Sequence, residues 1–178
     1  SSEKPYCLRE FGGTNLLLLA LEQARKANRV SSIVVSTDNL AVMNSVSRLD
    51  PKVIIHNRLE AANNLEKEID SVVASVIASK EVQSISFDCI TILNYEYPFR
   101  DIYVIDQSVD ILQAFNADSS MTVKPLNINL YQNSGKGLQP DRKNTNLRNE
   151  RESRYAEWGG VHSVTASSFN KNNRIHQD

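Results

Sequence analysis

Polar side chains follow three short aliphatic runs of this sequence, each at the point where the run ends. Ser36, Thr37 and Asp38 close the first run, Arg58 follows the second, and Asn94 follows the third. Ligands of open parallel sheets bind outside the carboxyl ends of the strands, so we expect these groups to converge on one polar site. The planar guanidinium of Arg58 could donate two parallel hydrogen bonds there, which would suit a phosphate-bearing ligand.

The same residues also have structural explanations. A polar residue at the end of a strand can cap the next helix through its side-chain oxygen, a contact worth about 1 kcal/mol. For Asp38 alone, capping is the better explanation. An arginine in a loop such as that of Arg58 is most often a solvated charge. We therefore weigh a phosphate-binding role and a surface role for Arg58 equally.

The elements that would position these residues alternate along the chain. Aliphatic runs at 32–36, 52–56 and 89–93 are too continuous for half-solvated edge strands and predict central parallel strands. Helices are expected at 16–29, at 40–49, along an apolar stripe from Leu65 to Ile77, and from Ile102 to Leu112. The alternation predicts a three-layer α/β fold, in which helices cover both faces of a mostly parallel, Rossmann-like sheet.

The chain of 178 residues fits one domain, since domains commonly have ~100–200 residues. From 127 to 153 the pattern dissolves into Asn, Gly, Lys and Arg, which predicts an exposed excursion or hairpin with Gly135 and Gly137 at a turn. A last strand at 159–164 then returns to the core. Residues 1–178 are therefore expected to form a single domain with one exposed excursion.

The composition excludes several classes of protein. The formal net charge is −1 with both signs interspersed, so no long-range field favours nucleic acid or an anionic membrane as a partner. The longest apolar run, Leu16 to Leu21, is far shorter than the ~20 residues that span a bilayer. Cys7 and Cys89 stand far apart, and the three histidines have no carboxylate at metal-ligand spacing. We therefore expect a cytoplasmic protein with no metal ligands in this sequence.

Five segments, taken together, resemble the cytidylyltransferases that activate acidic sugars, the family of the CMP-N-acylneuraminate and CMP-Kdo synthetases. The segments are SSEKPYCLREFGGTNLLL at 1–18, IVVSTDN at 33–39, NRLEAA at 57–62, LNYEYPFRD at 93–101 and RNERESRYAEWGGVH at 148–162. They match the family in order and spacing, so the resemblance covers nearly the whole chain. It implies the fold of the nucleotide-diphospho-sugar transferases.

The resemblance also implies roles for individual residues, although it identifies no catalytic residue. Arg58 would face the phosphates, the Asn94 amide would read the cytosine edge, and Arg148 would pair with the sugar carboxylate. The nucleotide-binding residues would be Lys4, Ser36, Asp38, Arg58 and Asn94. The substrate-binding residues would be Arg100, Arg148, Asn149 and Tyr155.

The family reaction transfers CMP from CTP to an acidic sugar and releases pyrophosphate, so the resemblance implies CTP and an acidic sugar as partners. It implies Mg²⁺ as cofactor, bound by aspartates that would lie beyond Asp178. It further implies a homodimer, in which the segment 127–153 reaches towards the sugar site of the neighbouring subunit. Positioning and electrostatic stabilisation would supply most of the acceleration in such chemistry.

Two other functions stay open. Glu96 places a carboxylate where a triphosphate would lie, and Trp158 stands where the family has an asparagine. Both changes favour a catalytically degenerate member of the fold that acts as a binding or regulatory subunit. A generic doubly wound domain for another nucleotide would keep the sheet but lose the reading of cytosine by Asn94.

Overall fold

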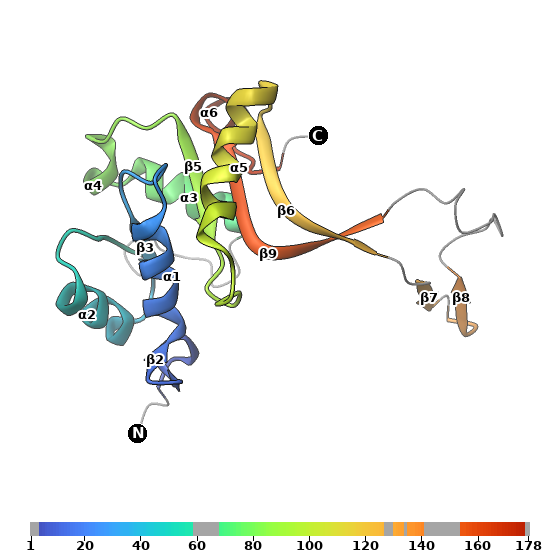
Figure 1. Ribbon diagram of the computed structural model, residues 1–178, viewed down its shortest axis with the longest axis horizontal. Coiled ribbons are helices and arrows are strands. Elements are labelled where there is room, and N and C mark those ends of the chain that lie inside the picture. The colour runs from blue at the N-terminus through green and yellow to red at the C-terminus, as the bar shows by residue number, and fades with distance from the viewer. Residues whose placement is uncertain (1–3, 59–67, 127–129, 134, 141–153, 177–178) are drawn as a thin grey trace. The chain divides into compact units, whose positions relative to one another are not determined.

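The computed structural model describes residues 4–58, 68–126, 130–133, 135–140 and 154–176 (Figure 1). The chain divides into two compact units, the first made of Ser1–Thr122 with Gly159–Asp178, and the second made of Val123–Trp158. None of the helices within the described residues is long and apolar enough to span a membrane.

The strands of the first unit form two small sheets and a hairpin. Strand β3 (Val34–Thr37) pairs in parallel with β4 (Ile54–Asn57). Strand β5 (Cys89–Leu93) pairs antiparallel with β9 (Arg154–Thr165), which also neighbours β6 (Ser119–Leu126). In the described part of the chain, β3, β4 and β5 each lie at the edge of a sheet, not at its centre as the sequence predicts, and β5 is antiparallel to its partner instead of parallel.

Six α-helices surround these strands within the described residues. Their bounds are α1 Leu16–Lys26, α2 Leu40–Leu49, α3 Ile69–Ala78, α4 Lys80–Gln83, α5 Ile102–Phe115 and α6 Ala166–Asn172. A short 3-10 helix, η1 (Tyr6–Leu8), and a hairpin of β1 (Glu10–Phe11) and β2 (Thr14–Asn15) precede α1. The boundaries of α2 agree with the prediction, since an asparagine begins this helix at the expected place.

Helix α1 ends three residues before the predicted position 29, and the cause is a long-range contact. Ala27 is already extended, and the backbone N–H groups of Asn28 and Arg29 donate to the carboxylate of Asp106, at 3.1 and 2.8 Å. Asp106 lies on α5, far along the sequence. These N–H groups are therefore satisfied outside the helix ladder, and α1 stops where they turn away.

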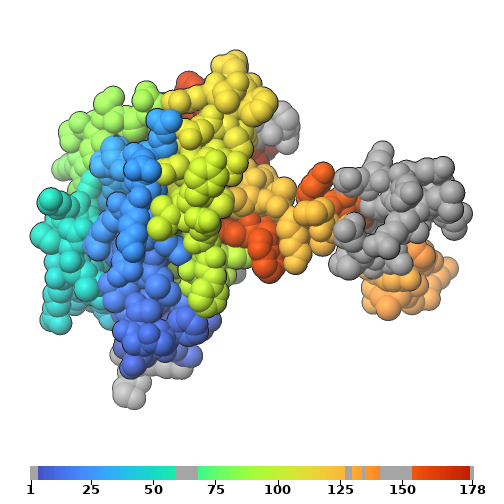
Figure 2. All heavy atoms as spheres, in the orientation of Figure 1, coloured from blue at the N-terminus to red at the C-terminus, as the bar shows by residue number. Residues whose placement is uncertain are grey.

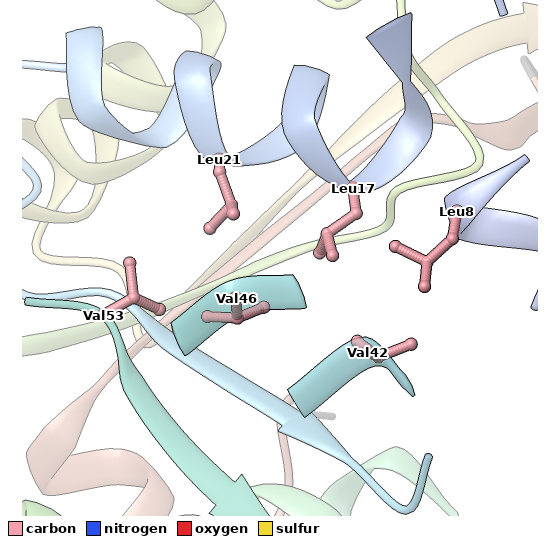
Figure 3. Packing of buried hydrophobic residues seen from close by; sticks show 6 residues of the cluster. All are labelled: Leu8, Leu17, Leu21, Val42, Val46 and Val53. Atoms are coloured by element: carbon pink, nitrogen blue, oxygen red, sulfur yellow. The ribbon is translucent and has the colours of Figure 1, made fainter. Parts of the chain in front are cut away.

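One face of the strands packs on α1 and α2. Figure 3 shows the side chains of this cluster converging between the two helices. Its buried members are Leu8, Leu17, Leu21, Val42, Val46 and Val53. Val35 and Ile55, from β3 and β4, pack against them. Burial of each such side chain contributes about 1.5–3 kcal/mol, so this cluster fixes the strand ends that carry Asp38 and Arg58.

The opposite face packs on other helices, which makes the first unit a three-layer arrangement. Val73 of α3 and Phe169 of α6 form a buried cluster with Ile90 and Ile92 of β5. The next residue of β5, Leu93, points to the other face, towards Ile105 of α5. Helices α1 and α5 contact each other on that face and lie side by side in the space-filling view (Figure 2). The predicted α/β class, with helices on both faces, is confirmed.

The second unit contains a small hairpin. Strands β7 (Tyr131–Asn133) and β8 (Leu138–Pro140) pair antiparallel around a turn in which Gly135 and Gly137 have positive φ angles, as the sequence predicts. Lys124 Nζ lies 4.1 Å from the centre of the Trp158 ring, a cation–π contact. The predicted excursion, 127–153, falls within this unit.

Candidate functional site

The ends of β3 and β4 bring Asp38 and Arg58 together. The backbone N–H of Arg58 donates to the carbonyl of Thr37, the last residue of β3, at 2.9 Å, which continues the parallel ladder one residue beyond the end of β4. Arg58 Nη2 then lies 3.2 Å from Asp38 Oδ1. The two side chains are 40% and 50% exposed, so the pair is open to solvent and to a ligand. Parallel pairing thus places one cation and one anion at the carboxyl edge, as the sequence predicts.

Among the described contacts, helix α2 begins without a capping hydrogen bond to Asp38. The Asn39 side chain caps the helix, and its Oδ1 accepts from the N–H groups of Ala41 and Val42 at 2.9 and 3.3 Å. Thr37 Oγ1 in turn accepts from the N–H of Asn39 at 3.1 Å. The capping explanation for Asp38 is therefore wrong, because the next residue does this work. The carboxylate of Asp38 pairs with Arg58 instead.

The loop after β5 approaches the same edge. Burial raises the pKa of the Tyr95 hydroxyl, and the neighbouring ionisable groups Cys7, Glu96 and Tyr6 raise it further. Arg58 acts in the opposite direction and lowers this pKa. Arg58 therefore lies within electrostatic range of Tyr95. The contacts of the site itself join the ends of β3 and β4, where the cation of Arg58 meets the carboxylate of Asp38.

Asn94 closes a tight turn at the end of β5. Its Oδ1 accepts from the N–H of Glu96 at 2.9 Å, an Asx turn, and its carbonyl accepts from the N–H of Tyr97 at 3.3 Å. The amide oxygen that could read a base is thus already used in this conformation. The predicted reading of a cytosine by Asn94 stays a prediction, and its amide nitrogen is the group that could contribute to it.

Arg100 is buried, and its guanidinium donates to backbone carbonyl groups instead of facing solvent. Its Nε donates to the carbonyl of Tyr97 at 3.1 Å, its Nη1 to that of Gly160 at 3.1 Å, and its Nη2 to that of Asn94. Desolvation by burial lowers the pKa of this guanidinium below its ordinary value. Arg100 therefore ties the loop after β5 to β9, and its predicted contact with a sugar stays untested.

Gly160 is required by this junction. Its φ angle is +59°, and a Cβ at this position would lie 2.6 Å from Tyr97 Cδ2 and 2.9 Å from the Asn94 Cβ. Real Cβ atoms do not approach that closely, so only glycine fits where β9 meets Tyr97 and Asn94. The second glycine of the pair 159–160 is thereby explained.

A buried hydrogen-bonded chain lies behind Ser36, and sequence analysis missed it. Ser36 Oγ and His56 Nδ1 are 2.9 Å apart, and His56 Nε2 lies 3.2 Å from Ser75 Oγ on α3. His56 is 6% exposed. Ser36 and His56 are direct partners in the β3–β4 register. Their matching places near the ends of the two predicted strands were the available signal.

The structure does not test the roles of the remaining predicted residues. Lys4 is exposed, and its described contact is a weak one of 3.5 Å from Arg9 Nε to its backbone carbonyl. Tyr155 lies on β9 in the second unit and is 59% exposed. Arg148 and Asn149 lie outside the described residues. Within the described ranges, no three or more His, Cys, Asp and Glu side chains gather into a group that could hold a metal ion.

Comparison with known proteins gives a fold but no close relative. No protein-family model matches this sequence, and no curated protein matches it. Among solved structures, a CMP:2-keto-3-deoxy-manno-octonic acid synthetase complexed with CTP matches 100% of this chain and 75% of its own, with a TM-score of 0.68 and 12% sequence identity. The fold of this chain is therefore also found in a CTP-bound synthetase.

Two further solved structures agree. A 4-diphosphocytidyl-2C-methyl-D-erythritol synthase from Anaerococcus prevotii matches 96% of this chain and 72% of its own, with a TM-score of 0.63 and 10% identity. A 2-C-methyl-D-erythritol 4-phosphate cytidylyltransferase from Thermus thermophilus matches 98% and 75%, with a TM-score of 0.57 and 14% identity. The chain therefore has the fold of the cytidylyltransferases, as the sequence resemblance implies.

Proposed function

We propose that this protein is a nucleotidyltransferase that transfers CMP from CTP to an acidic sugar and releases pyrophosphate. One observation carries the proposal: the chain matches, over its whole length, a synthetase solved with CTP. The carboxyl edge of its strands presents Arg58, whose guanidinium suits the phosphate oxygens of a nucleotide. This combination of fold and cation favours a nucleoside triphosphate at the carboxyl edge of the strands.

The acidic sugar is the finer part of the proposal. It rests on the resemblance of the segment 148–162, within which Arg148 would pair with the sugar carboxylate. The matching structures include a synthetase named for a keto-deoxy-octonic acid and enzymes named for an erythritol phosphate, so the fold serves more than one acceptor. A carboxylate-bearing acceptor is distinguished from a phosphate-bearing one by direct competition of the two in an activity assay.

In the proposed reaction the protein would act mainly by positioning. Arg58 would donate to a phosphate oxygen, the Asn94 amide nitrogen would donate to the base, and Arg100 would keep the loop after β5 in place. Such fixed donors stabilise charge that develops on the phosphate without reorganising. We propose that Mg²⁺ arrives with the nucleotide and neutralises its phosphates, since Mg²⁺ keeps several waters and substrate oxygens as ligands. No described residue is assigned to the metal.

We also propose a homodimer. The second unit exposes several large apolar side chains, which is typical of a surface that meets another protein. They include Tyr131, Leu138, Tyr155 and Trp158, which are 57%, 73%, 59% and 54% exposed. Light scattering across a range of protein concentrations tests this proposal, and a monomer at high concentration would contradict it.

A binding or regulatory subunit without turnover is the second candidate. Two observations favour it: Arg58 is already paired with Asp38, and the Asn94 amide oxygen is already used within its own turn. Arg58 would have to change partner when a nucleotide binds, and Asn94 has only its amide nitrogen left for a base. This candidate predicts nucleotide binding, or none, with no release of pyrophosphate in the presence of any acidic sugar.

Calorimetric titration with CTP in the presence of Mg²⁺ tests the nucleotide site, with ATP and UTP as competing ligands. We expect selective binding of CTP and its loss in the Arg58→Ala variant. Arg48→Ala is a matched control, because Arg48 is an exposed arginine of α2 about 12 Å along the helix from its start. Equal binding of all three nucleotides, or full binding by the Arg58 variant, would contradict the proposed site.

A further inference from the structure

We propose that Asp38 is an internal competitor for the phosphate site: its carboxylate holds the Arg58 guanidinium, and an incoming phosphate must displace it. The inference rests on the proposed function, because it needs a phosphate-bearing ligand at Arg58. It gives Asp38 an effect opposite in sign to the one that the family resemblance implies, in which Asp38 helps to bind the nucleotide. The sign of the effect can therefore be measured.

The geometry leaves the Asp38 carboxylate with one described partner. Its Oδ1 lies 3.2 Å from Arg58 Nη2, at the hydrogen-bonding distance that a phosphate oxygen would also take. Helix α2 does not need this carboxylate, because Asn39 caps the helix. The ladder contact between Arg58 N–H and the Thr37 carbonyl fixes the arginine beside the end of β3. Asp38 is thus positioned to hold Arg58 and is not required for the local fold.

The positive charge of Arg58 faces a carboxylate before any phosphate arrives, since Asp38 Oδ1 lies 3.2 Å from Arg58 Nη2. A phosphate would enter a site whose cation is already compensated. Neutralising Asp38 would release Arg58 while leaving the positions of the strands unchanged, since asparagine has nearly the same shape as aspartate.

The size of the effect follows from the exposure of the pair. The two side chains are 40% and 50% exposed, and ion pairs at such sites contribute little because water screens them. A ligand that displaces Asp38 therefore loses only a small part of its affinity. We expect Asp38→Asn to tighten nucleotide binding by about 1.4- to 5-fold.

The experiment is a double-mutant cycle in ligand binding on the whole chain. CTP with Mg²⁺, and separately inorganic pyrophosphate, are titrated into the wild type, Asp38→Asn, Arg58→Gln and the double variant. We expect Asp38→Asn to bind both ligands more tightly, Arg58→Gln to bind them more weakly, and the double variant to equal Arg58→Gln. The last result would show that Asp38 acts through Arg58.

Asp110→Asn is the matched control. Asp110 pairs with Arg29 at 2.6 Å, and the two side chains are 47% and 50% exposed, much like the pair at the site. Asp110 lies about 12 Å along α5 from its first residue, Ile102. Removing the negative charge of Asp110 should leave the affinities for CTP and for pyrophosphate unchanged. Tightening of equal size in this control would overturn the inference, because it would be an effect of net charge.

The other outcomes separate this inference from the proposed function. Weaker or unchanged binding by Asp38→Asn, with CTP bound by the wild type, would overturn the inference and leave the proposed function standing. Tightening that persists in the Arg58→Gln background would also overturn it, since Asp38 would then act by direct repulsion of the phosphate. Failure of every variant to bind either ligand would refute both proposals together.

Discussion

Replacing Arg100 with methionine should destabilise the protein much more than the same replacement of an exposed arginine. The Arg100 guanidinium donates to the backbone carbonyls of Asn94, Tyr97 and Gly160. A hydrogen bond from a charged donor contributes about 1.5–3 kcal/mol, but part of this sum is offset because the buried charge has lost its water. The lowered pKa of Arg100 reflects that desolvation. We expect Arg100→Met to lower the free energy of unfolding by about 2–5 kcal/mol.

Urea unfolding followed by circular dichroism measures this change, with Arg48→Met on the exposed face of α2 as control. The control should change the free energy of unfolding by less than about 0.5 kcal/mol, as surface substitutions usually do. An Arg100 variant that unfolds like the wild type but has lost affinity for an acidic sugar would refute the structural role. It would then favour the substrate-binding role that the resemblance implies.

Two further predictions concern stability. Burial acts to raise the pKa of Asp106, but hydrogen bonds, first from the N–H groups of residues 29 and 28, outweigh it and hold this pKa below its ordinary value. The contribution of the Asp106 carboxylate to the free energy of unfolding is therefore present above about pH 4. It is lost as the pH falls through the folded-state pKa. Asp106→Asn should flatten the loss of stability between pH 5 and pH 3, measured by thermal unfolding, and an unchanged pH profile would contradict this. Gly160→Ala should cost more than Gly12→Ala, because both residues have nearly equal φ angles, +59° and +56°, but only Gly160 would press a Cβ against Tyr97. Urea unfolding of the two variants measures the difference, which we expect to be about 1–3 kcal/mol, and equal losses would show that backbone strain alone accounts for both.

Much of the fold could be predicted because its signals are local. The run from Cys89 to Leu93 is strand β5 in full, and Leu40–Leu49 is helix α2 in full. The first is a continuous aliphatic run that ends at a polar residue, and the second has a polar residue before its start. The early end of α1 could not be predicted, because it depends on Asp106 of another helix. The antiparallel partner of β5 was missed for the same reason, as strand pairing is set by the tertiary fold.

The candidate site divides in the same way. The convergence of Asp38 and Arg58 follows from parallel pairing, which the sequence predicts. The burial of Arg100 does not, because the sequence has no sign that three carbonyl groups would gather around it. The serine–histidine–serine chain behind Ser36 also needs the register of two strands and the position of α3. The residue roles that could not be predicted from the sequence are therefore those that depend on contacts between distant segments.

The open edges of β3 and β5 affect how self-association of this chain is to be interpreted. In the part of the chain that the structure describes, β3 pairs with β4 alone and β5 with β9 alone, so one side of each strand has backbone groups without a ladder partner. The runs VVST and CITIL carry no charge and no proline, the devices by which natural edge strands resist pairing. Two copies could therefore join by strand addition, through contacts of the first unit. An assembly that survives truncation of the second unit would be of this kind and would not be the proposed homodimer.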